Sequence, residues 1–440
     1  MYALGMDIGT SSLSAVLVDI ESGKVIDTQS VVNATAIMAD SWAQLQDPNQ
    51  IWHKTDDIIK KMLNNHPKVS CIGLTGQMHG IVYVDNNGTA ISPLYTWQDG
   101  RGDLIREAGL TYAQYLSQET GLDLATGYGA VTHLYNIENG LVPKNTRYAM
   151  TIQDYVAMKL AASTEPLIHS SNANSLGAPN WPGIAPLVNA TDQTVTINGS
   201  ADIPVAIAIG DNQASFIGSV KDTSDTVLIN MGTGGQISMT ADGIALCNGV
   251  ETRTYVDGGT LLVAFSLCGG RAYSLLEQFF RETATLCGID SQCLTDSHCL
   301  YNKMNELASI PLVEPLAINT SFSGTRINPS LHGAINGINP RNFTPAHFVQ
   351  GVLQGMVDEL FVFYPSMCKA ANKQPKQLIG AGNGIRKNPA LVRRFEQAFG
   401  LDMQIPIYKE EAAYGAALFS MAACGLRSSL SDAQKLISYI

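Results

Sequence analysis

Two segments of the chain share one pattern, and this repeat constrains the fold more than any other feature. The segment GMDIGTSSLSA covers residues 5–15, and the segment LINMGTGGQIS covers residues 228–238. Each is an apolar strand, a Gly-Thr pair with two small residues and a second strand, which predicts a β-hairpin with a small-residue tip. Because the two hairpins lie half the chain length apart, the repeat suggests one architecture used twice.

The chance occurrence of two such tips is the alternative, since Gly-Thr turns are common. A chain of 440 residues is nevertheless long enough for two or three domains. Residues 218–226, GSVKDTSDT, are polar and rich in turn formers, as expected of a boundary. We therefore predict an N-terminal domain over residues 1–217 and a C-terminal domain over residues 218–440. The Pro/Gly/Asn-rich residues 175–190 are predicted to be a long loop.

Helical patterns alternate with these strands. Residues 48–64 begin with Pro48 after Asp47, precede a strand over residues 70–76, and carry one apolar face formed by Ile51, Thr55, Ile58, Ile59 and Met62. In the second half, we predict a helix that Thr344 caps, a helix from Pro389 to Gly400, and a last helix over residues 410–425. The second-half core stripe is predicted to be Phe348, Leu353, Met356, Leu360 and Phe361. The fold class is therefore α/β.

Composition excludes several function classes. No apolar run reaches the length of a membrane span, and the N-terminus lacks the basic region of a secretory signal, so a cytoplasmic protein is expected. The net charge of -11, without a Lys/Arg-rich run, argues against nucleic acid and membrane surfaces as partners. The negative net charge does not exclude binding of small anionic ligands, because backbone N–H groups and magnesium can hold them.

The eight cysteines are expected to be reduced thiols. Cys287, Cys293 and Cys299 beside His298 have wider spacing than a zinc site uses, which argues against a metal there.

The two small-residue tips predict phosphate binding, because they expose backbone N–H groups without side chains in the way. Asp7, just before the first tip, is placed to reach a phosphate-bound magnesium through water. A Gly-rich loop, GAGNG, covers residues 380–384. It lacks the dinucleotide fingerprint, because Ile385 stands where the third glycine belongs, so a nucleoside site is favoured over NAD.

A polar cluster in the first half has the chemistry of a polyol site. The segment GQMHG covers residues 76–80, and TWQDGR covers residues 96–101. They supply planar hydrogen-bonding groups for hydroxyls and an aromatic face for C–H surface, namely Gln77, His79, Trp97, Gln98, Asp99 and Arg101. The alternative is structural: a turn with an Asp-Arg ion pair and a histidine with satisfied hydrogen bonds.

Asp211 ends the apolar segment IPVAIAIG at residues 203–210. Taken alone, it fits a helix N-cap, whose side chain accepts a backbone N–H, as well as it fits a catalytic carboxylate.

Six ordered motifs give this chain a resemblance to the FGGY carbohydrate kinases, a branch of the actin-like ATPase clan. They are DIGTSS, GLTGQMHG, WQDGR, GDNQAS, NMGTGG and GAGNGIRKN. The resemblance implies a two-domain actin-like, ribonuclease-H-like fold, with mixed sheets flanked by helices and a catalytic cleft between the domains. It also implies ATP and Mg²⁺ as cofactors. GQMHG resembles the xylulokinase and sedoheptulokinase branches rather than the glycerol kinases. TWQDGR, ATGYG, TIQDYV and NANSLG resemble the sedoheptulokinase branch more than the xylulokinases.

By position, the resemblance implies roles for individual residues. Asp211 resembles the general base. Asp7 and Asp211 would be the carboxylates that bind magnesium. The sugar contacts would be Gln77, Met78, His79, Trp97, Asp99, Arg101 and Asn212. The phosphate loops would be Gly9, Thr10 and Ser11 with Gly232, Thr233 and Gly234, and the adenosine pocket Gly382, Asn383 and Asn388.

Three features depart from the family pattern. SGTRINP, residues 323–329, resembles the Gly-Glu-Arg loop with Thr325 in place of Glu, and Ser14 stands where a lysine is usual. The chain is also shorter than most relatives.

The resulting expectation is an ATP-dependent kinase that phosphorylates a primary hydroxyl of a ketose, with sedoheptulose favoured. A kinase for xylulose or another pentulose is the alternative. A non-catalytic sugar and ATP sensor and an actin-like assembly protein are alternatives from other classes. The expected partners are the ketose and ATP, and homodimer formation is left open.

Overall fold

The computed structural model describes residues 1–106, 109–177, 190–191, 196–198, 202–243, 247, 249–289, 297–325, 328 and 330–440. These residues form two compact units. Unit 1 contains Met1–Lys221, Arg253–Gly259 and Glu410–Ile437, and unit 2 contains Asp222–Thr252, Thr260–Lys409 and Ser438–Ile440. The division therefore differs from the contiguous domains 1–217 and 218–440, because a C-terminal segment belongs to unit 1. Residues 178–189, most of the predicted loop, lie outside the described residues.

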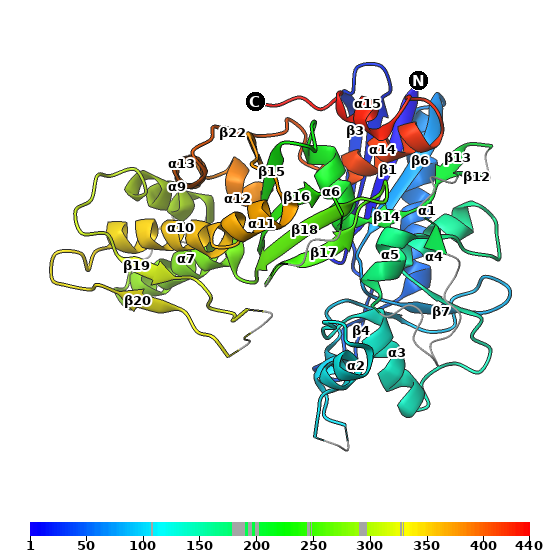
Figure 1. Ribbon diagram of the computed structural model, residues 1–440, viewed down its shortest axis with the longest axis horizontal. Coiled ribbons are helices and arrows are strands. Elements are labelled where there is room, and N and C mark those ends of the chain that lie inside the picture. The colour runs from blue at the N-terminus through cyan, green and yellow to red at the C-terminus, as the bar shows by residue number, and fades with distance from the viewer. Residues whose placement is uncertain are drawn as a thin grey trace. The chain divides into compact units, whose positions relative to one another are not determined.

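Unit 1 is built on a mixed sheet of order β12-β13-β6-β1-β2-β3, with β14 paired to β6 (Figure 1). Strands β1 and β2 form the predicted N-terminal hairpin, and β1 runs parallel to β6, which runs parallel to β14. The strands are β1 (Tyr2–Ile8), β2 (Ser12–Asp19), β3 (Val25–Val32), β6 (Val69–Gly76), β12 (Thr196–Asn198), β13 (Pro204–Ala206) and β14 (Ile209–Gly210).

The predicted first helix is present as α1 (Pro48–Asn65). The Asp47 side chain caps it by accepting hydrogen bonds from the backbone N–H groups of Asn49 and Gln50, and the predicted apolar face is buried. Smaller elements complete unit 1: β4 (Ala36–Ile37), β5 (Leu45–Gln46), β7 (Val82–Val84), β8 (Leu94–Tyr95), η1 (Gly100–Asp103), α2 (Tyr112–Thr120), α3 (Gly129–Glu138), β9 (Tyr148–Met150), α4 (Ile152–Leu160), β10 (Ile168–His169), α5 (Ser170–Ser175), β11 (Ala190–Thr191), α6 (Asp211–Ser219) and α15 (Leu430–Gln434).

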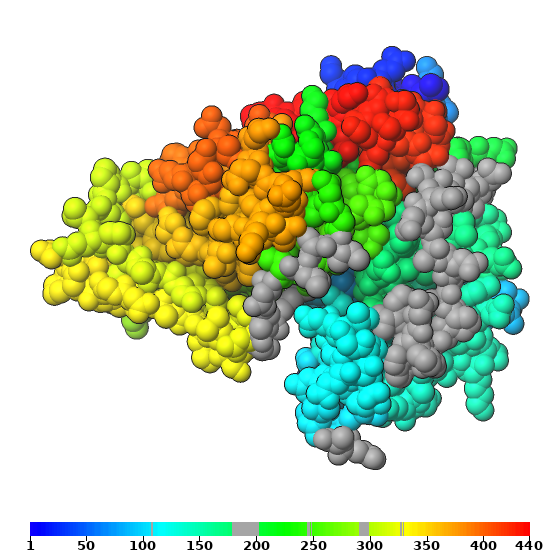
Figure 2. Space-filling view, in the orientation of Figure 1, coloured from blue at the N-terminus to red at the C-terminus, as the bar shows by residue number. Residues whose placement is uncertain are grey.

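The last long helix, α14 (Glu411–Ala423), explains why the C-terminal segment belongs to unit 1. It packs on β1, β6 and α6. A Cβ added at Gly5 would lie 1.9 Å from the carbonyl oxygen of Ala413, and one at Gly73 would lie 1.9 Å from that of Ala416. Glycine in both strands thus permits a backbone approach that a larger residue would block. In Figure 2, the residues of this segment, in red, lie beside the blue N-terminal residues.

Unit 2 contains a second mixed sheet, of order β17-β18-β16-β15-β21-β22. Strands β15 and β16 form the second predicted hairpin, and β15 runs parallel to β21. The chain passes from unit 2 to unit 1 within β17. The strands are β15 (Thr226–Met231), β16 (Gly235–Ala241), β17 (Glu251–Thr254), β18 (Thr260–Ser266), β19 (Ala317–Asn319), β20 (Ala334–Asn336), β21 (Gln377–Ala381) and β22 (Met403–Gln404).

Helices of unit 2 contribute its apolar core. They are α7 (Gly269–Leu286), α9 (Ser297–Leu307), α10 (Pro345–Phe361), α11 (Tyr364–Ala371), α12 (Asn383–Arg386) and α13 (Pro389–Phe399). In α10, the predicted stripe residues Leu353, Met356 and Leu360 are buried, whereas Phe348 and Phe361 pack at the edge of the core. Thr344 precedes α10, but its hydroxyl bonds the His347 ring instead of a backbone N–H.

The described residues overturn the expectation for the cysteines. Six cysteines are free, but Cys299 is disulfide-bonded, so the expectation that every cysteine is reduced was wrong. In the part of the chain that the structure describes, no helix has the length and apolarity needed to cross a membrane.

Candidate functional site

The carboxyl ends of three parallel strands gather the predicted acceptor-side residues in unit 1. Strand β6 lies between β1 and β14, so Asp7 and Ile209 both pair with Thr75 across the sheet. The segments that continue these strands begin at Gly9, Gln77 and Asp211, and therefore leave the same edge. In open α/β sheets, ligands bind at this edge.

The first predicted phosphate loop is joined to the predicted sugar residues by hydrogen bonds. The Thr10 hydroxyl donates to Gln77 Oε1 at 3.2 Å and accepts from Trp97 Nε1 at 3.0 Å. Gln46, which sequence reasoning missed, accepts from Gln77 Nε2 at 2.9 Å and donates to the Thr10 carbonyl at 2.8 Å. Trp97 is 42% exposed as a residue, so part of its ring can contact a ligand.

His79 has a strained backbone and a fixed ring. Its φ of +71° lies in the left-handed region that favours glycine. Its Nδ1 lies 2.6 Å from the Ser175 carbonyl oxygen, and its ring stacks on Tyr128 with centroids 4.4 Å apart. Strain of this kind persists only where the surroundings hold it, and it concentrates at functional sites.

Asp211 is not the helix cap. The N-cap of α6 is Gly210, and Asp211 is the first helical residue, so the capping interpretation is corrected. Its Oδ1 accepts a hydrogen bond from Asn212 Nδ2 at 3.0 Å. Desolvation by burial raises the pKa of Asp211, and the charge of Arg253 together with hydrogen bonds from Asn212 opposes that shift. A carboxylate with a raised pKa is a better proton acceptor near neutral pH.

Arg253 is a second functional candidate that sequence reasoning missed. Its guanidinium donates to Asn212 Oδ1, lies 3.7 Å from Met78 Sδ and lies 3.5 Å from His79 Nε2. It therefore contacts three of the predicted sugar residues. The surrounding sequence, ETRT, carries no motif that could have identified it.

Asp7 has the chemistry of a magnesium-associated carboxylate. Its Oδ1 is buried and has no hydrogen-bond partner among the described residues. Burial and the negative charges of Asp211 and Glu410 raise the pKa of Asp7 to about 7. A cation would offset both effects, and magnesium needs only one or two protein carboxylates, so the residues fit this ion. Within the described ranges, no cluster of three or more metal-ligating side chains occurs.

We expect Asp7→Asn to stabilise the protein while removing activity. Between pH 4 and pH 7 the folded state holds a proton on Asp7 that the unfolded state has lost, so stability falls as the pH rises through this window. The variant should therefore unfold at a higher urea concentration than the parent at pH 8. Its free energy of unfolding should be higher by about 2 kcal/mol or more at pH 8, and this difference should shrink toward pH 4.

The matched control is Asp19→Asn, at the end of the same hairpin. Hydrogen bonds from Ser22 lower the pKa of Asp19, so this variant should lose stability at pH 8. If Asp7→Asn is less stable than the parent at pH 8, the raised pKa of Asp7 is contradicted.

Asp99 and Arg101 form a buried ion pair, the structural alternative that the sequence had left open. Arg101 Nε lies 2.5 Å from Asp99 Oδ1, and both side chains are almost fully buried. Asp99 also accepts from the Arg101 and Gln44 backbone N–H groups. The guanidinium lies over the Tyr95 ring at 4.2 Å. The pair thus fixes the loop that carries Trp97.

The second predicted phosphate loop is a tight turn in unit 2, closed by a hydrogen bond from the Gly232 N–H to the Gly234 carbonyl at 3.0 Å. The start of α7 packs on it. The backbone N–H of Arg271 donates to the Thr233 carbonyl at 3.0 Å, and a Cβ at Gly269 would lie 2.2 Å from Gly234. Close packing therefore fixes the turn.

The residues predicted for an adenosine pocket divide into two groups. Gly382 and Asn383 follow β21 beside the second loop, and Gly382 has a φ of +83° with Met231 directly against it. Asn388 instead caps α13, because its Oδ1 accepts from the Leu391 N–H at 3.0 Å. In the segment 323–329, residues 326, 327 and 329 lie outside the described residues.

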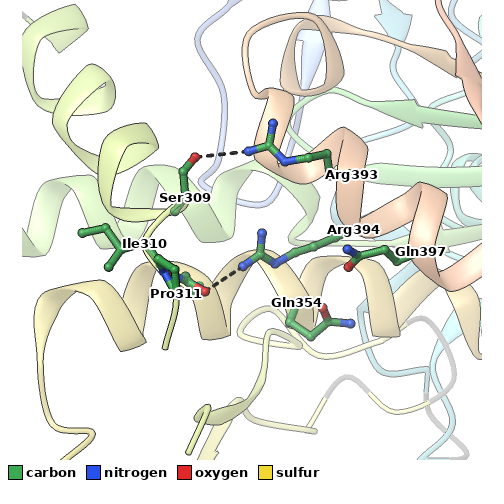
Figure 3. A pocket seen from close by; sticks show the side chains of 9 residues that line it. Ser309, Ile310, Pro311, Gln354, Arg393, Arg394 and Gln397 are labelled. Atoms are coloured by element: carbon green, nitrogen blue, oxygen red, sulfur yellow. Dashed lines mark hydrogen bonds between the residues drawn. The ribbon is translucent and has the colours of Figure 1, made fainter. Parts of the chain in front are cut away.

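Unit 2 also contains a cavity of about 300 Å³ that includes none of the predicted site residues. Figure 3 shows that Arg393 and Arg394 of α13 extend toward the segment that follows α9. Arg393 donates to Ser309 Oγ, and Arg394 donates to Gln350 Oε1, both at 3.1 Å. These arginines therefore have neutral partners in the described structure.

Comparison with known families identifies the chain. Residues 2–176 match the N-terminal domain of the FGGY family of carbohydrate kinases, and residues 227–424 match its C-terminal domain. The chain belongs to the FGGY family of carbohydrate kinases. It is thus a carbohydrate kinase, as the motifs predicted.

Individual FGGY kinases resemble the chain at low identity. Mouse sedoheptulokinase is 26% identical, over 94% of this chain and 96% of its own. A Bacillus subtilis gluconokinase is 22% identical, over 96% of this chain and 88% of its own. The xylulose kinase structure from Lactobacillus acidophilus has a TM-score of 0.84 at 18% identity, covering 100% of this chain and 92% of that one. These likenesses confirm the two-domain actin-like fold and leave the substrate unassigned.

Proposed function

We propose that this FGGY kinase transfers the γ-phosphoryl group of ATP to a primary hydroxyl of a ketose, with sedoheptulose as the favoured substrate and sedoheptulose 7-phosphate as the product. The observation that carries the proposal is the acceptor-side cluster in unit 1. There, Asp211 lies beside Asn212 and Arg253, and the guanidinium contacts Met78 and His79. The likeness to mouse sedoheptulokinase over nearly the whole chain supports the choice of sugar.

The acceptor residues have distinct roles in this proposal. Asp211 accepts the proton of the attacking hydroxyl, and its raised pKa suits that task. Gln77, Met78, His79 and Asn212 bind the sugar, and the exposed part of the Trp97 ring packs against its C–H surface. Asp99 and Arg101 act indirectly, because their ion pair holds the loop of Trp97 in place.

The donor side is assigned to backbone groups. Gly9, Thr10 and Ser11 form one phosphate loop, and Gly232, Thr233 and Gly234 form the other, while Gly382 and Asn383 contribute to the nucleoside site. Asp7 and Asp211 would hold Mg²⁺, which neutralises charge on the transferring phosphoryl group when bound. Asn388 supports the nucleoside site by capping α13.

A second candidate substrate class is an aldonic acid. Arg253 places a guanidinium among the predicted sugar contacts, and guanidinium groups bind carboxylates. The Bacillus subtilis relative is a gluconokinase. Xylulose, or another pentulose, remains the nearest alternative ketose, because substrates that differ by one hydroxymethyl group are separated by small changes in a pocket.

Coupled ADP release across a substrate panel tests the proposal. The panel contains sedoheptulose, D-xylulose, D-ribulose, L-ribulose, L-fuculose, glycerol and gluconate. Sedoheptulose is expected to give the highest kcat/KM. A higher value with D-xylulose or gluconate would reassign the substrate, and absence of ADP release with every member would favour a non-catalytic sensor.

A further inference from the structure

Arg253 reaches the acceptor-side cluster from a remote part of the sequence. It lies in the short segment Arg253–Gly259, which belongs to unit 1 although the chain on either side of it belongs to unit 2. Its neighbour Thr254 anchors the segment, because the Thr254 carbonyl accepts from Gln213 Nε2 at 2.8 Å and its hydroxyl accepts from Asn174 Nδ2 at 2.6 Å. The guanidinium is thereby fixed beside α6.

Two neighbours, the Ser175 carbonyl and Arg253, face the two ring nitrogens of His79. The Ser175 carbonyl can only accept, so His79 Nδ1, at 2.6 Å from it, carries a proton. A guanidinium offers only N–H groups, so His79 Nε2, at 3.5 Å from Arg253 Nη2, presents its lone pair. These two contacts fit the neutral Nδ1–H tautomer of the ring.

The same guanidinium determines how Asn212 is oriented. Arg253 Nη1 donates to the Asn212 carboxamide oxygen, which leaves the carboxamide nitrogen to donate to Asp211 Oδ1 at 3.0 Å. Reversal of this amide would place its nitrogen against a cation and its oxygen against a carboxylate. Arg253 therefore orients the residue that holds the proposed base.

We infer that Arg253 is a positioning and specificity-determining residue of the sugar site, which donates to the Nε2 lone pair of His79 and fixes the orientation of Asn212 through one rigid fork. This inference rests on the proposed function, because it concerns the sugar contacts of that reaction. Lysine cannot replace the fork, since its single ammonium group cannot span both partners in the planar geometry of a guanidinium.

Steady-state kinetics of Arg253→Met and Arg253→Lys test the inference in the full-length protein. Hydrogen bonds to charged groups have energies that correspond to about 10- to 100-fold in a binding constant. We expect KM for the ketose to rise by about that factor in Arg253→Met, while KM for ATP stays within about twofold. Arg253→Lys should remain at least about fivefold impaired. Arg147→Met, whose guanidinium lies over Tyr148, is the matched control and should leave both KM values unchanged.

A spectroscopic readout separates positioning from a general effect on folding. The ¹⁵N resonances of the eight histidines can be recorded, and His79→Gln assigns those of His79. In the parent and in Arg147→Met, Nδ1 should be protonated and Nε2 unprotonated. In Arg253→Met, Nε2 should move to higher ¹⁵N frequency because it loses its N–H donor.

Failure of the inference is distinct from failure of the proposed function. A parent protein without kinase activity on any panel substrate would refute the proposed function. In an active parent, a ketose KM within about twofold after Arg253→Met, or equal increases in both KM values, would overturn the inference. An unshifted Nε2 resonance in Arg253→Met would also overturn it.

Discussion

Asp211→Asn is expected to lower kcat by about 10²- to 10⁴-fold, because asparagine cannot accept the proton of the attacking hydroxyl. The carboxamide keeps the size of the side chain and can still accept the hydrogen bond from Asn212 that Oδ1 accepts now. The dissociation constant of the ketose should therefore change by no more than about threefold. Steady-state ADP release measures the first quantity and titration calorimetry the second.

The control for this substitution is Asp222→Asn. Asp222 is an exposed carboxylate that accepts from the Ser224 backbone and hydroxyl groups in a turn of unit 2. Its substitution should leave kcat unchanged. An Asp211→Asn variant that retains more than about one tenth of the parent turnover would show that Asp211 is not the base.

Asp99→Ala is expected to destabilise the protein by about 3–5 kcal/mol, because it leaves the buried Arg101 guanidinium without its anionic partner. The remaining neighbours of Arg101 are aromatic rings, including Tyr95 and Tyr135, and the side-chain oxygen of Asn136. Urea unfolding measures the loss.

Asp99→Ala/Arg101→Met provides the control, because it removes both charges and should recover part of the lost stability. If Asp99 instead contacts the sugar directly, Asp99→Ala should have a free energy of unfolding within about 1 kcal/mol of the parent value. Its KM for the ketose should then rise more than about tenfold. That result would show that Asp99 contacts the sugar directly.

Elements with local signals were predictable from the sequence. The hairpin at β1 and β2 follows from strand periodicity and a small-residue tip, and α1 follows from its apolar face and the Asp47 cap. Gln77 and His79 could be proposed for the same reason, since the Gly-rich segment after β6 is contiguous, whereas Met78 was added by the family resemblance.

Features that depend on tertiary packing were not predictable. Arg253 has no local motif, and the role proposed for it rests on contacts with residues 41 or more positions away. The return of α14 to unit 1 depends on glycines in β1 and β6, which look like ordinary strand positions until the helix backbone lies against them. The N-cap of α6 is Gly210 and not Asp211. The sequence could not distinguish these positions, because the residue pattern at the start of a helix fits adjacent residues about equally.

Asp99 and Arg101 show a further limit. An acidic and a basic residue two positions apart can both contact a ligand, or can pair with each other. Burial decides between these outcomes, because a buried charge without a partner is costly. Here the aromatic neighbours that bury Arg101 come from β8 and α3, which the local sequence does not reveal.

Phosphoryl transfer from ATP to sedoheptulose can be observed by ³¹P NMR of a reaction containing the full-length protein, MgATP and sedoheptulose. We expect the γ-phosphate signal of ATP to be replaced by signals of ADP and of one phosphate monoester on a primary carbon, with each product formed in equal amount. The Asp211→Asn variant should give neither product on the same time scale. Inorganic phosphate as the sole phosphorus product besides ADP, or an unchanged ATP spectrum with every sugar of the panel, would contradict phosphoryl transfer to a sugar.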